Sequence, residues 1–407
     1  MAETVVRRGE RVRLGRVEGD LRAEDGAEVS AEEGGRVVVS GEARFEGSAR
    51  LRSPFECRRL RVEHGEFEAD GELRVEDRLR ADDARVTLRG PLSVAALSVG
   101  PFLALGGPTS FETGDVGGVL EATAATTFRT LSVGGSLRAS APLKGGRLSV
   151  GGDARLAAVD LDGVEAGGEI QLGGGVVRET IEVGGVFSAR EDLTFGNLEV
   201  GGTASFGAGG RGRRVEVGGV LSAARDLTVE RLEVGGECVV GGSLTTGRTE
   251  VGGVLRVGGG LILSDHLEVG GRLEVAGDVV GPSAEIGGTL RARSARFTGA
   301  AEVAGPVRTS AGLRAASLKI ANGSEVHGPV VGGTVEVGRH GRVETVFGTR
   351  VELGAHGQAD RIVGGSVEVG ADCRVGSIEY VRHLSLGRRV QLSRPAVQLA
   401  TLPTPPR

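Results

Sequence analysis

Seven glutamates recur along the middle of this sequence, each of them two residues before a pair of glycines. They are Glu182, Glu199, Glu216, Glu233, Glu250, Glu268 and Glu285. If the repeats stack, these carboxylates form one outward column in which like charges about 5 Å apart repel by roughly 1 kcal/mol each before salt screening. Such a column is either a solvated face that limits lateral aggregation or a stripe that binds cations or a basic partner. No Asp-Gly loop with calcium-loop spacing lies beside it, so no defined metal site is predicted there.

A second polar column is predicted further along the chain, where a polar residue follows a glycine at the same distance in successive repeats. Its members are His340, His356 and Asp372. Two imidazoles and a carboxylate are ligands that Zn²⁺ accepts. The next repeat places Arg389 in this column and offers no fourth ligand. We therefore predict polar corner residues here and no metal site.

Catalytic patterns are not readable in the sequence. There is no Ser/His/Asp order, and glycine pairs without a following helix are not phosphate-binding loops. Hexapeptide-repeat acyltransferases need a regular aliphatic subperiod that this chain lacks. Pectinolytic β-helices cluster Asp, Lys or Arg on one face, whereas here the acids are spread along a ladder and the only lysines are Lys144 and Lys319. We predict no catalytic residue, no cofactor and no enzymatic activity.

The composition limits the partners and the compartment. The net charge is −5 with both signs mixed, which gives no case for nucleic acid or an anionic membrane surface. The three cysteines, Cys57, Cys238 and Cys373, are far apart and support neither a disulfide framework nor a zinc site. No signal-peptide core and no run of about 18 apolar residues is found. We expect a cytoplasmic protein without direct membrane insertion.

The glycine pairs set the organisation of the chain, because they return at steps of 16 to 18 residues, most of them 17. Their first glycines are Gly117, Gly134, Gly151, Gly167, Gly184, Gly201, Gly218, Gly235, Gly252, Gly270 and Gly287. So regular a period indicates one small unit stacked on itself. With no Trp and a single Tyr, the interior is expected to be narrow and to admit only small side chains.

Each repeat is expected to contain short strands separated by corners. Leu198 and Val200 alternate with Glu199, which is typical of a strand with one buried face. The glycine pair that follows is expected to turn the chain through positive φ, which costs glycine little. Propeller blades and leucine-rich repeats are longer, and a hairpin meander would not keep one period. The pattern predicts an all-β fold, a long single-stranded parallel β-helix with three faces and about 17 residues per coil.

The same register continues outside the glycine pairs, for example at Gly338, Gly354, Gly370 and Gly387. We predict a continuous β-helix rod over residues 5–399 with roughly 23 coils, about 110 Å long at about 4.8 Å per coil. The rod is expected to have three parts: residues 5–90, which are more charged, 91–290 with regular glycine pairs, and 291–399 with variant coils of 16–17 residues. Residues 1–4 and the Pro-rich tail, residues 400–407, are expected to be disordered.

The first and last coils of such a stack leave strand edges that invite pairing with another chain. No amphipathic cap is evident near either end of the repeat. The apolar residues of the terminal coils therefore form a predicted polymerisation interface. They are Val5, Val6, Val12, Leu14, Val390, Leu392, Val397 and Leu399.

Gly-rich and Val-rich coils of this length, few aromatics, a Pro-containing tail and no catalytic cluster together resemble the bactofilins, the polymer-forming cytoskeletal proteins. The resemblance is best between Leu97 and Gly288 and depends on pattern. It implies a right-handed, three-faced β-helix that polymerises without nucleotide into non-polar filaments through its terminal coils. Members of the family are usually much shorter, and those that bind membranes carry a hydrophobic and basic N-terminal peptide that is not found here.

We therefore expect a homopolymer, with other cytoskeletal or scaffolded proteins as further partners. The alternative is a capped monomeric or dimeric β-helical rod that acts as a scaffold for protein partners. Charged substitutions at the terminal coils would distinguish the two, since only the first depends on them.

Overall fold

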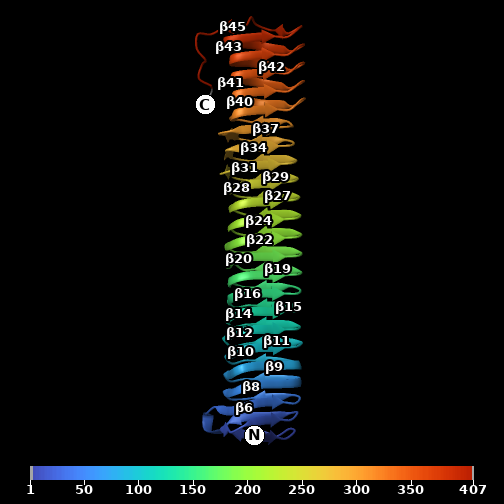
Figure 1. Ribbon diagram of the computed structural model, residues 1–407, viewed down its shortest axis with the longest axis vertical. Helices are drawn as coiled ribbons and strands as arrows, with labels where there is room; N and C mark the ends of the chain where they lie inside the picture. The colour runs from blue at the N-terminus through green and yellow to red at the C-terminus, as the bar shows by residue number, and fades with distance from the viewer. Residues whose placement is uncertain (1–2, 406–407) are drawn as a thin grey trace. The chain divides into compact units, whose positions relative to one another are not determined.

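The computed structural model describes residues 3–405 and confirms the predicted all-β class, with 69% strand and 1% helix. Parallel coils about 17 residues apart form a β-solenoid of about 23 turns (Figure 1). The chain divides into two compact units, residues 1–201 and 202–407. This division lies within the region of regular glycine pairs and not near residues 90 or 290, where the composition changes. That residues 5–399 form one continuous rod stays a prediction.

The described part of the first unit contains strands β1 to β22 and the short 3-10 helix η1. Their bounds are β1 (Glu3–Val6), β2 (Arg11–Leu14), β3 (Arg16–Val17), β4 (Asp20–Ala23), β5 (Ala27–Ala31), η1 (Glu32–Gly34), β6 (Val37–Phe45), β7 (Ala49–Leu51), β8 (Phe55–Ala69), β9 (Leu73–Leu88), β10 (Leu92–Val99), β11 (Phe102–Leu105), β12 (Thr109–Val116), β13 (Val119–Ala122), β14 (Thr126–Val133), β15 (Ser136–Ala139), β16 (Leu143–Val150), β17 (Ala154–Leu156), β18 (Val159–Ala166), β19 (Glu169–Leu172), β20 (Gly175–Val183), β21 (Val186–Ala189) and β22 (Leu193–Val200).

The described part of the second unit contains strands β23 to β45. Their bounds are β23 (Thr203–Phe206), β24 (Gly210–Val217), β25 (Val220–Ala223), β26 (Leu227–Val234), β27 (Glu237–Val240), β28 (Leu244–Val251), β29 (Val254–Val257), β30 (Leu261–Leu263), β31 (His266–Val269), β32 (Arg272–Val275), β33 (Asp278–Gly281), β34 (Ser283–Ile286), β35 (Leu290–Ala292), β36 (Ser294–Phe297), β37 (Ala300–Val303), β38 (Val307–Thr309), β39 (Leu313–Ile320), β40 (Glu325–Val337), β41 (Arg342–Leu353), β42 (Gln358–Val369), β43 (Arg374–Leu386), β44 (Gln391–Leu392) and β45 (Val397–Gln398).

Each regular coil has three sides, built from an eight-residue strand that bends and a four-residue strand that follows it. In β12 the burial alternates except at Glu112 and Thr113, which both face solvent. Two successive outward residues mark the bend between two sides of the coil, because an unbent strand alternates strictly. β13 then supplies the third side, with Leu120 and Ala122 buried.

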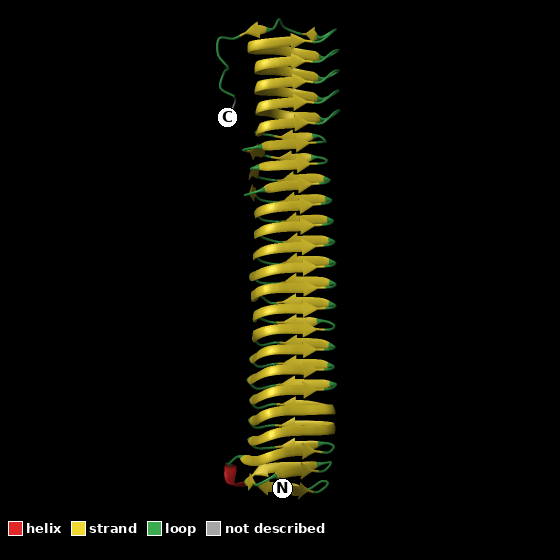
Figure 2. Cartoon of the chain, viewed as in Figure 1, coloured by secondary structure: helices red, strands yellow, loops and turns green. Residues whose placement is uncertain are grey.

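Coil length varies where the sequence departs from the regular repeat. Thr109 pairs with Thr126, a step of 17 residues, which is typical of the middle of the chain. Leu21 pairs with Ala43, because η1 is inserted at the corner between β5 and β6 (Figure 2). In the last coils a single strand of 12 or 13 residues bends around all the sides, as in β42.

The interior contains mainly Val, Leu and Ala, but phenylalanines are fully buried in both units, so the expectation that only small side chains fit inside was wrong. Three of these phenylalanines form a cluster in the first unit. The rings of Phe45 and Phe67 lie 5.1 Å apart between centroids, and Phe55 contacts Phe45 edge-on at 6.3 Å. All three side chains are fully buried, so this cluster fills the coils around η1 with large apolar groups.

The glycine-pair corners do not use positive φ, so that expectation was wrong. Among the described residues, the glycines with positive φ are Gly9, Gly19, Gly26, Gly34, Gly47, Gly65, Gly175, Gly312, Gly323 and Gly328, none of which belongs to a repeated pair. The corner requires glycine because successive coils approach too closely for a side chain. A Cβ at Gly118 would lie 2.0 Å from the carbonyl oxygen of Pro101, and one at Gly288 would lie 2.1 Å from that of Gly271.

At the N-terminal end the first strand begins earlier than expected, and at the C-terminal end the last strand ends close to the expected residue. β1 begins at Glu3, so residues 3 and 4 belong to a strand and not to a disordered segment. The last strand ends at Gln398, and residues 399–405 have no regular secondary structure. The disorder expected for residues 1, 2, 406 and 407 lies outside the described residues.

Candidate functional site

The first coil presents a strand edge with partly exposed apolar residues. β1, β2 and β3 each pair with one later strand, namely β4, β5 and β6. Val6 lies inside the coil and is buried, whereas Val5 points outward and is 47% exposed. Val12 and Leu14 face inward but are only half-buried. Of the four residues predicted here, Val12 and Leu14 therefore supply the apolar surface of the edge.

The last coil presents a second edge with partly exposed apolar residues, Leu384 and Leu386, which the sequence prediction did not include. The last four residues of β43 pair with Ser366–Val369 of β42, and no described strand pairs with their other side. In the coil below, Val367 and Val369 are buried in the same two columns. Leu384 is half-buried and Leu386 is 43% exposed, because no further coil covers them.

The predicted C-terminal residues belong to short segments beside this edge. Val390, Leu392 and Leu399 are half-buried, and Val397 is exposed. The backbone N–H of Leu399 donates to the carbonyl of Tyr380 over 2.7 Å, which holds the end of the repeat against β43. After β45 the chain turns back toward the level of the preceding coils (Figure 1). It therefore leaves the edge at Leu384 and Leu386 open.

The seven glutamates predicted to stack, which we call the glutamate ladder, lie in register on successive coils within each unit. Glu182 pairs with Glu199 in the first unit. In the second unit the in-register pairs continue through Glu216, Glu233, Glu250, Glu268 and Glu285. All seven side chains are exposed or half-buried. The column continues to Glu302 and then reverses charge at Lys319.

Cations interrupt the repulsion within this column at several places. The Arg214 guanidinium lies 2.8 Å from Glu216 and 3.2 Å from Glu233. Arg248 pairs with Glu250 at 2.6 Å. These pairs are partly exposed, so each contributes little stability by itself, but together they neutralise Glu216, Glu233 and Glu250.

The His340, His356 and Asp372 column lies at the corners of the last coils. All three residues have φ near +60°, as does Arg389, so they occupy the left-handed turn positions of successive coils. The rings of His340 and His356 stack 4.8 Å apart and 7° from parallel. Asp372 instead accepts from Arg389, whose Nε lies 2.7 Å from its carboxylate. Since the only carboxylate is already paired with a guanidinium, the geometry favours a structural corner over a metal site.

The three cysteines do not form a reactive group. Each is buried and none is in a disulfide. Burial raises the pKa of Cys57 and Cys373, and it raises the pKa of Cys238 to about 12. Nucleophilic chemistry needs the thiolate, so these side chains act as small apolar groups of the interior.

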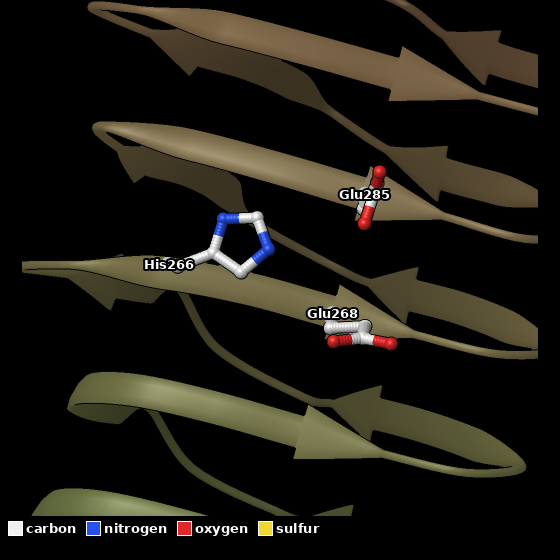
Figure 3. A group of neighbouring side chains, drawn as sticks. All are labelled: His266, Glu268 and Glu285. Carbon is white, nitrogen blue, oxygen red and sulfur yellow. The ribbon is translucent and has the colours of Figure 1, made fainter.

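One group of potential ligands was missed by the sequence analysis. His266 lies close to two members of the ladder, Glu268 and Glu285, at the junction of two coils (Figure 3). The signal that could have revealed it is the residue two positions before each glutamate. That residue is Arg in three successive coils and becomes histidine only at His266.

Comparison of the chain with protein-family models, with curated proteins and with solved structures gave no match. Within residues 3–405 there is also no helix with the length and hydropathy needed to cross a bilayer.

Proposed function

We propose that this chain is a structural protein that assembles with copies of itself into filaments by stacking of its terminal coils, as its resemblance to the bactofilins implies. The β-solenoid fold supports a structural role, because its regular surface consists of short strands and ion-paired columns. No nucleotide is required in this scheme, since the energy for assembly comes from strand pairing and apolar burial at the ends.

The observation that carries the proposal is the open edge at Leu384 and Leu386. Within the stack, the residues of these two columns are fully buried, as at Val367 and Val369. Burial of a leucine side chain is worth about 1.5–3 kcal/mol relative to exposure. The free N–H and C=O groups of the edge would pair at the same time, which makes a second copy the natural occupant.

Non-polar filaments require like ends to meet. Two C-terminal edges related by a two-fold axis would form one self-complementary junction, and two N-terminal edges around Val12 and Leu14 would form the other. In such junctions the paired strands run antiparallel, whereas within each chain they are parallel. The axial repeat of the filament would then contain two copies, about 220 Å if each rod has the length of about 110 Å expected from its coils.

We also propose a cytoplasmic location without an enzymatic role. Three unpaired thiols are typical of a reducing compartment. Further cytoskeletal or scaffolded proteins would bind the sides of the coils, which stay accessible in an end-to-end assembly.

Electron microscopy of the purified full-length chain, without nucleotide or metal, tests this function. The decisive variant combines Leu384→Asp with Leu386→Asp, because carboxylates at both positions repel across a junction of two C-terminal edges. The matched control is Ile262→Arg, because Ile262 is 53% exposed on the side of a coil and away from both ends. Wild type and the control should form filaments a few nanometres wide.

The double variant should stop at dimers joined through the N-terminal edge, which sedimentation would measure. Filaments that persist in the double variant would refute assembly through the C-terminal edge. Discrete particles of the wild-type chain over a wide concentration range would instead support the alternative of a capped monomeric or dimeric scaffold.

A further inference from the structure

A column of arginines lies beside the glutamate ladder, and at His266 the arginine of this column is replaced by a histidine. Arg214 pairs in register with Arg231, and Arg231 pairs with Arg248. His266 follows in this column, because the next residues along the two strands, Thr249 and Leu267, pair with each other. Ser283 follows His266. The permanent cation of the earlier coils is thus replaced by an imidazole and then by a hydroxyl.

The glutamates at this place lose their neutralising partners. Among the described residues, neither Glu268 nor Glu285 forms an ion pair with a lysine or arginine. The nearest basic groups of the neighbouring coils are bound elsewhere, Arg248 to Glu250 at 2.6 Å and Lys319 to Glu302 at 2.6 Å. Two stacked carboxylates therefore face each other across one coil spacing without a cation between them.

The imidazole completes a group of three ligand atoms. One ligand atom each from His266, Glu268 and Glu285 lie within 4.8 Å of one another. In Figure 3 one ring nitrogen of His266 points toward the next coil and the other toward the side on which both carboxylates lie. Ser283 Oγ lies 2.9 Å from Nδ1 of His266. This hydrogen bond orients the ring and leaves Nε2 available, as second partners of metal-bound histidines do.

We propose that His266, Glu268 and Glu285 bind one divalent zinc ion that bridges the coils of β31 and β34. One imidazole nitrogen with two carboxylate oxygens is a ligand set that zinc accepts, and water would complete its tetrahedron. Tetrahedral ligands at about 2.0 Å from zinc lie about 3.3 Å apart, so ligand atoms that now lie within 4.8 Å of one another need to approach by as much as about 1.5 Å. Both glutamates are exposed and free to adjust their rotamers. The ion would supply the positive charge that arginine supplies in the preceding coils.

A second histidine with two glutamates shows what distinguishes this group. His327 Nδ1 lies 3.1 Å from Glu344, and its Nε2 lies 3.7 Å from Glu325. There, however, Glu344 also accepts the backbone N–H of Gly328, and Arg342 lies 3.5 Å from Glu325. Those carboxylates already have partners and the ring lies between them, so His327 is an internal control with the same residue types.

Calorimetric titration of the EDTA-treated full-length chain with zinc chloride tests the proposal, with cobalt absorption spectra as a second readout of coordination. Wild type should bind one equivalent. His266→Arg restores the residue type of the earlier coils, should keep the far-ultraviolet circular dichroism, and should lose this equivalent. Ser283→Ala should weaken binding about tenfold, since it removes the group that orients the ring. His327→Ala should bind as wild type does.

Several results would overturn the site. The first is no saturable zinc binding by wild type, and the second is full binding by His266→Arg. The third is loss of binding in His327→Ala, or in a double variant with His340→Ala and His356→Ala, while His266→Arg still binds. Glu285→Gln serves as an independent variant on the neighbouring coil, and unchanged affinity there would also contradict the bridge. The three ligands lie on the side of the coils and not at the terminal edges, so the outcome is separate from that of the proposed function.

Discussion

Gly135 stacks directly on Gly118 of the preceding coil: its N–H lies 3.0 Å from the Gly118 carbonyl oxygen, and a Cβ at Gly135 would lie 2.6 Å from the same oxygen. The hydrogen bond that joins the coils thus brings the backbones too close for any side chain. This relationship recurs at Gly152, whose Cβ would lie 2.7 Å from the carbonyl oxygen of Gly135. Close approach between coils, and not an unusual dihedral angle, explains the repeated glycine.

Gly135→Ala should therefore destabilise the coils around β13 and β15 by about 1–3 kcal/mol, the usual cost of overpacking. Hydrogen exchange of the amides in these strands would measure the change locally. Gly163→Ala is the matched control, because a Cβ there would meet its nearest atom, the Thr180 carbonyl oxygen, at 3.5 Å. The control should be neutral or slightly stabilising, by at most about 1 kcal/mol. Equal effects of the two substitutions would contradict the steric explanation.

The phenylalanine cluster gives a second prediction. Phe67→Ala removes a fully buried ring that lies 5.1 Å from Phe45, and should cost about 3–5 kcal/mol. Phe102→Ala is a comparable truncation of a half-buried ring whose face is covered by the Arg85 guanidinium at 3.8 Å. That control should cost much less, since an exposed cation–π contact is worth about 0.5–1 kcal/mol. Urea unfolding followed by hydrogen exchange would compare them, in β6 and β8 for Phe67→Ala and in β9 and β11 for Phe102→Ala. Similar losses would exclude a special role for the cluster.

The repeat could be read from the sequence because stacking repeats the same environment in every coil. Leu198 and Val200 are buried and Glu199 is not, as their alternation predicts. What could not be read was any feature that depends on contacts between coils. The corner glycines are explained by the carbonyl of the coil below, and the insertion of η1 lengthens one coil so that Leu21 pairs with Ala43.

The candidate sites were less predictable for the same reason. The open edge includes Leu386 because the chain turns away after the last full coil. Tyr380 of β43 occupies a column that holds Gly332, Gly348 and Gly364 in the preceding coils, and this break can be recognised only when the coils are placed in register. His266 becomes a potential ligand only when its coil is placed in register with that of Glu285. The stacked rings of His340 and His356 share a turn conformation that the sequence position alone does not reveal.

The buried thiols predict a chain that resists modification while it is folded. With a pKa of about 12, roughly one Cys238 side chain in 10,000 is ionised at pH 8, and burial blocks access of the reagent as well. Ellman's reagent should modify none of the three cysteines of the native chain within the time that modifies all three in denaturant. Thr245→Cys places a thiol on an exposed position and should react at once. Rapid reaction of the native wild type would show that the interior opens locally.

The carboxylate of Asp278 predicts a specific sensitivity to acid. Its Oδ1 accepts hydrogen bonds from Arg293 Nε at 2.9 Å and from Ser294 Oγ at 2.7 Å. These hydrogen bonds lower the pKa of Asp278 to about 2, and the bond from Arg293 has the largest effect. Because folding lowers this pKa from an ordinary value near 3.9, the pair stabilises the folded chain above about pH 4. The contribution should be lost as the pH falls from about 4 to about 2.

Asp278→Asn should therefore lower the melting temperature at neutral pH and have much less effect at about pH 2, where the wild-type carboxylate is about half protonated in the folded chain and most of its ionic contribution is lost. The informative quantity is the difference between the melting temperatures of wild type and variant across this range, since other carboxylates titrate equally in both. Asp265→Asn is the matched control at an exposed aspartate of the same unit, and its difference from wild type should not follow the same course. A difference between wild type and Asp278→Asn that is independent of pH would mean that the hydrogen bond to Ser294, and not the charge, holds this corner.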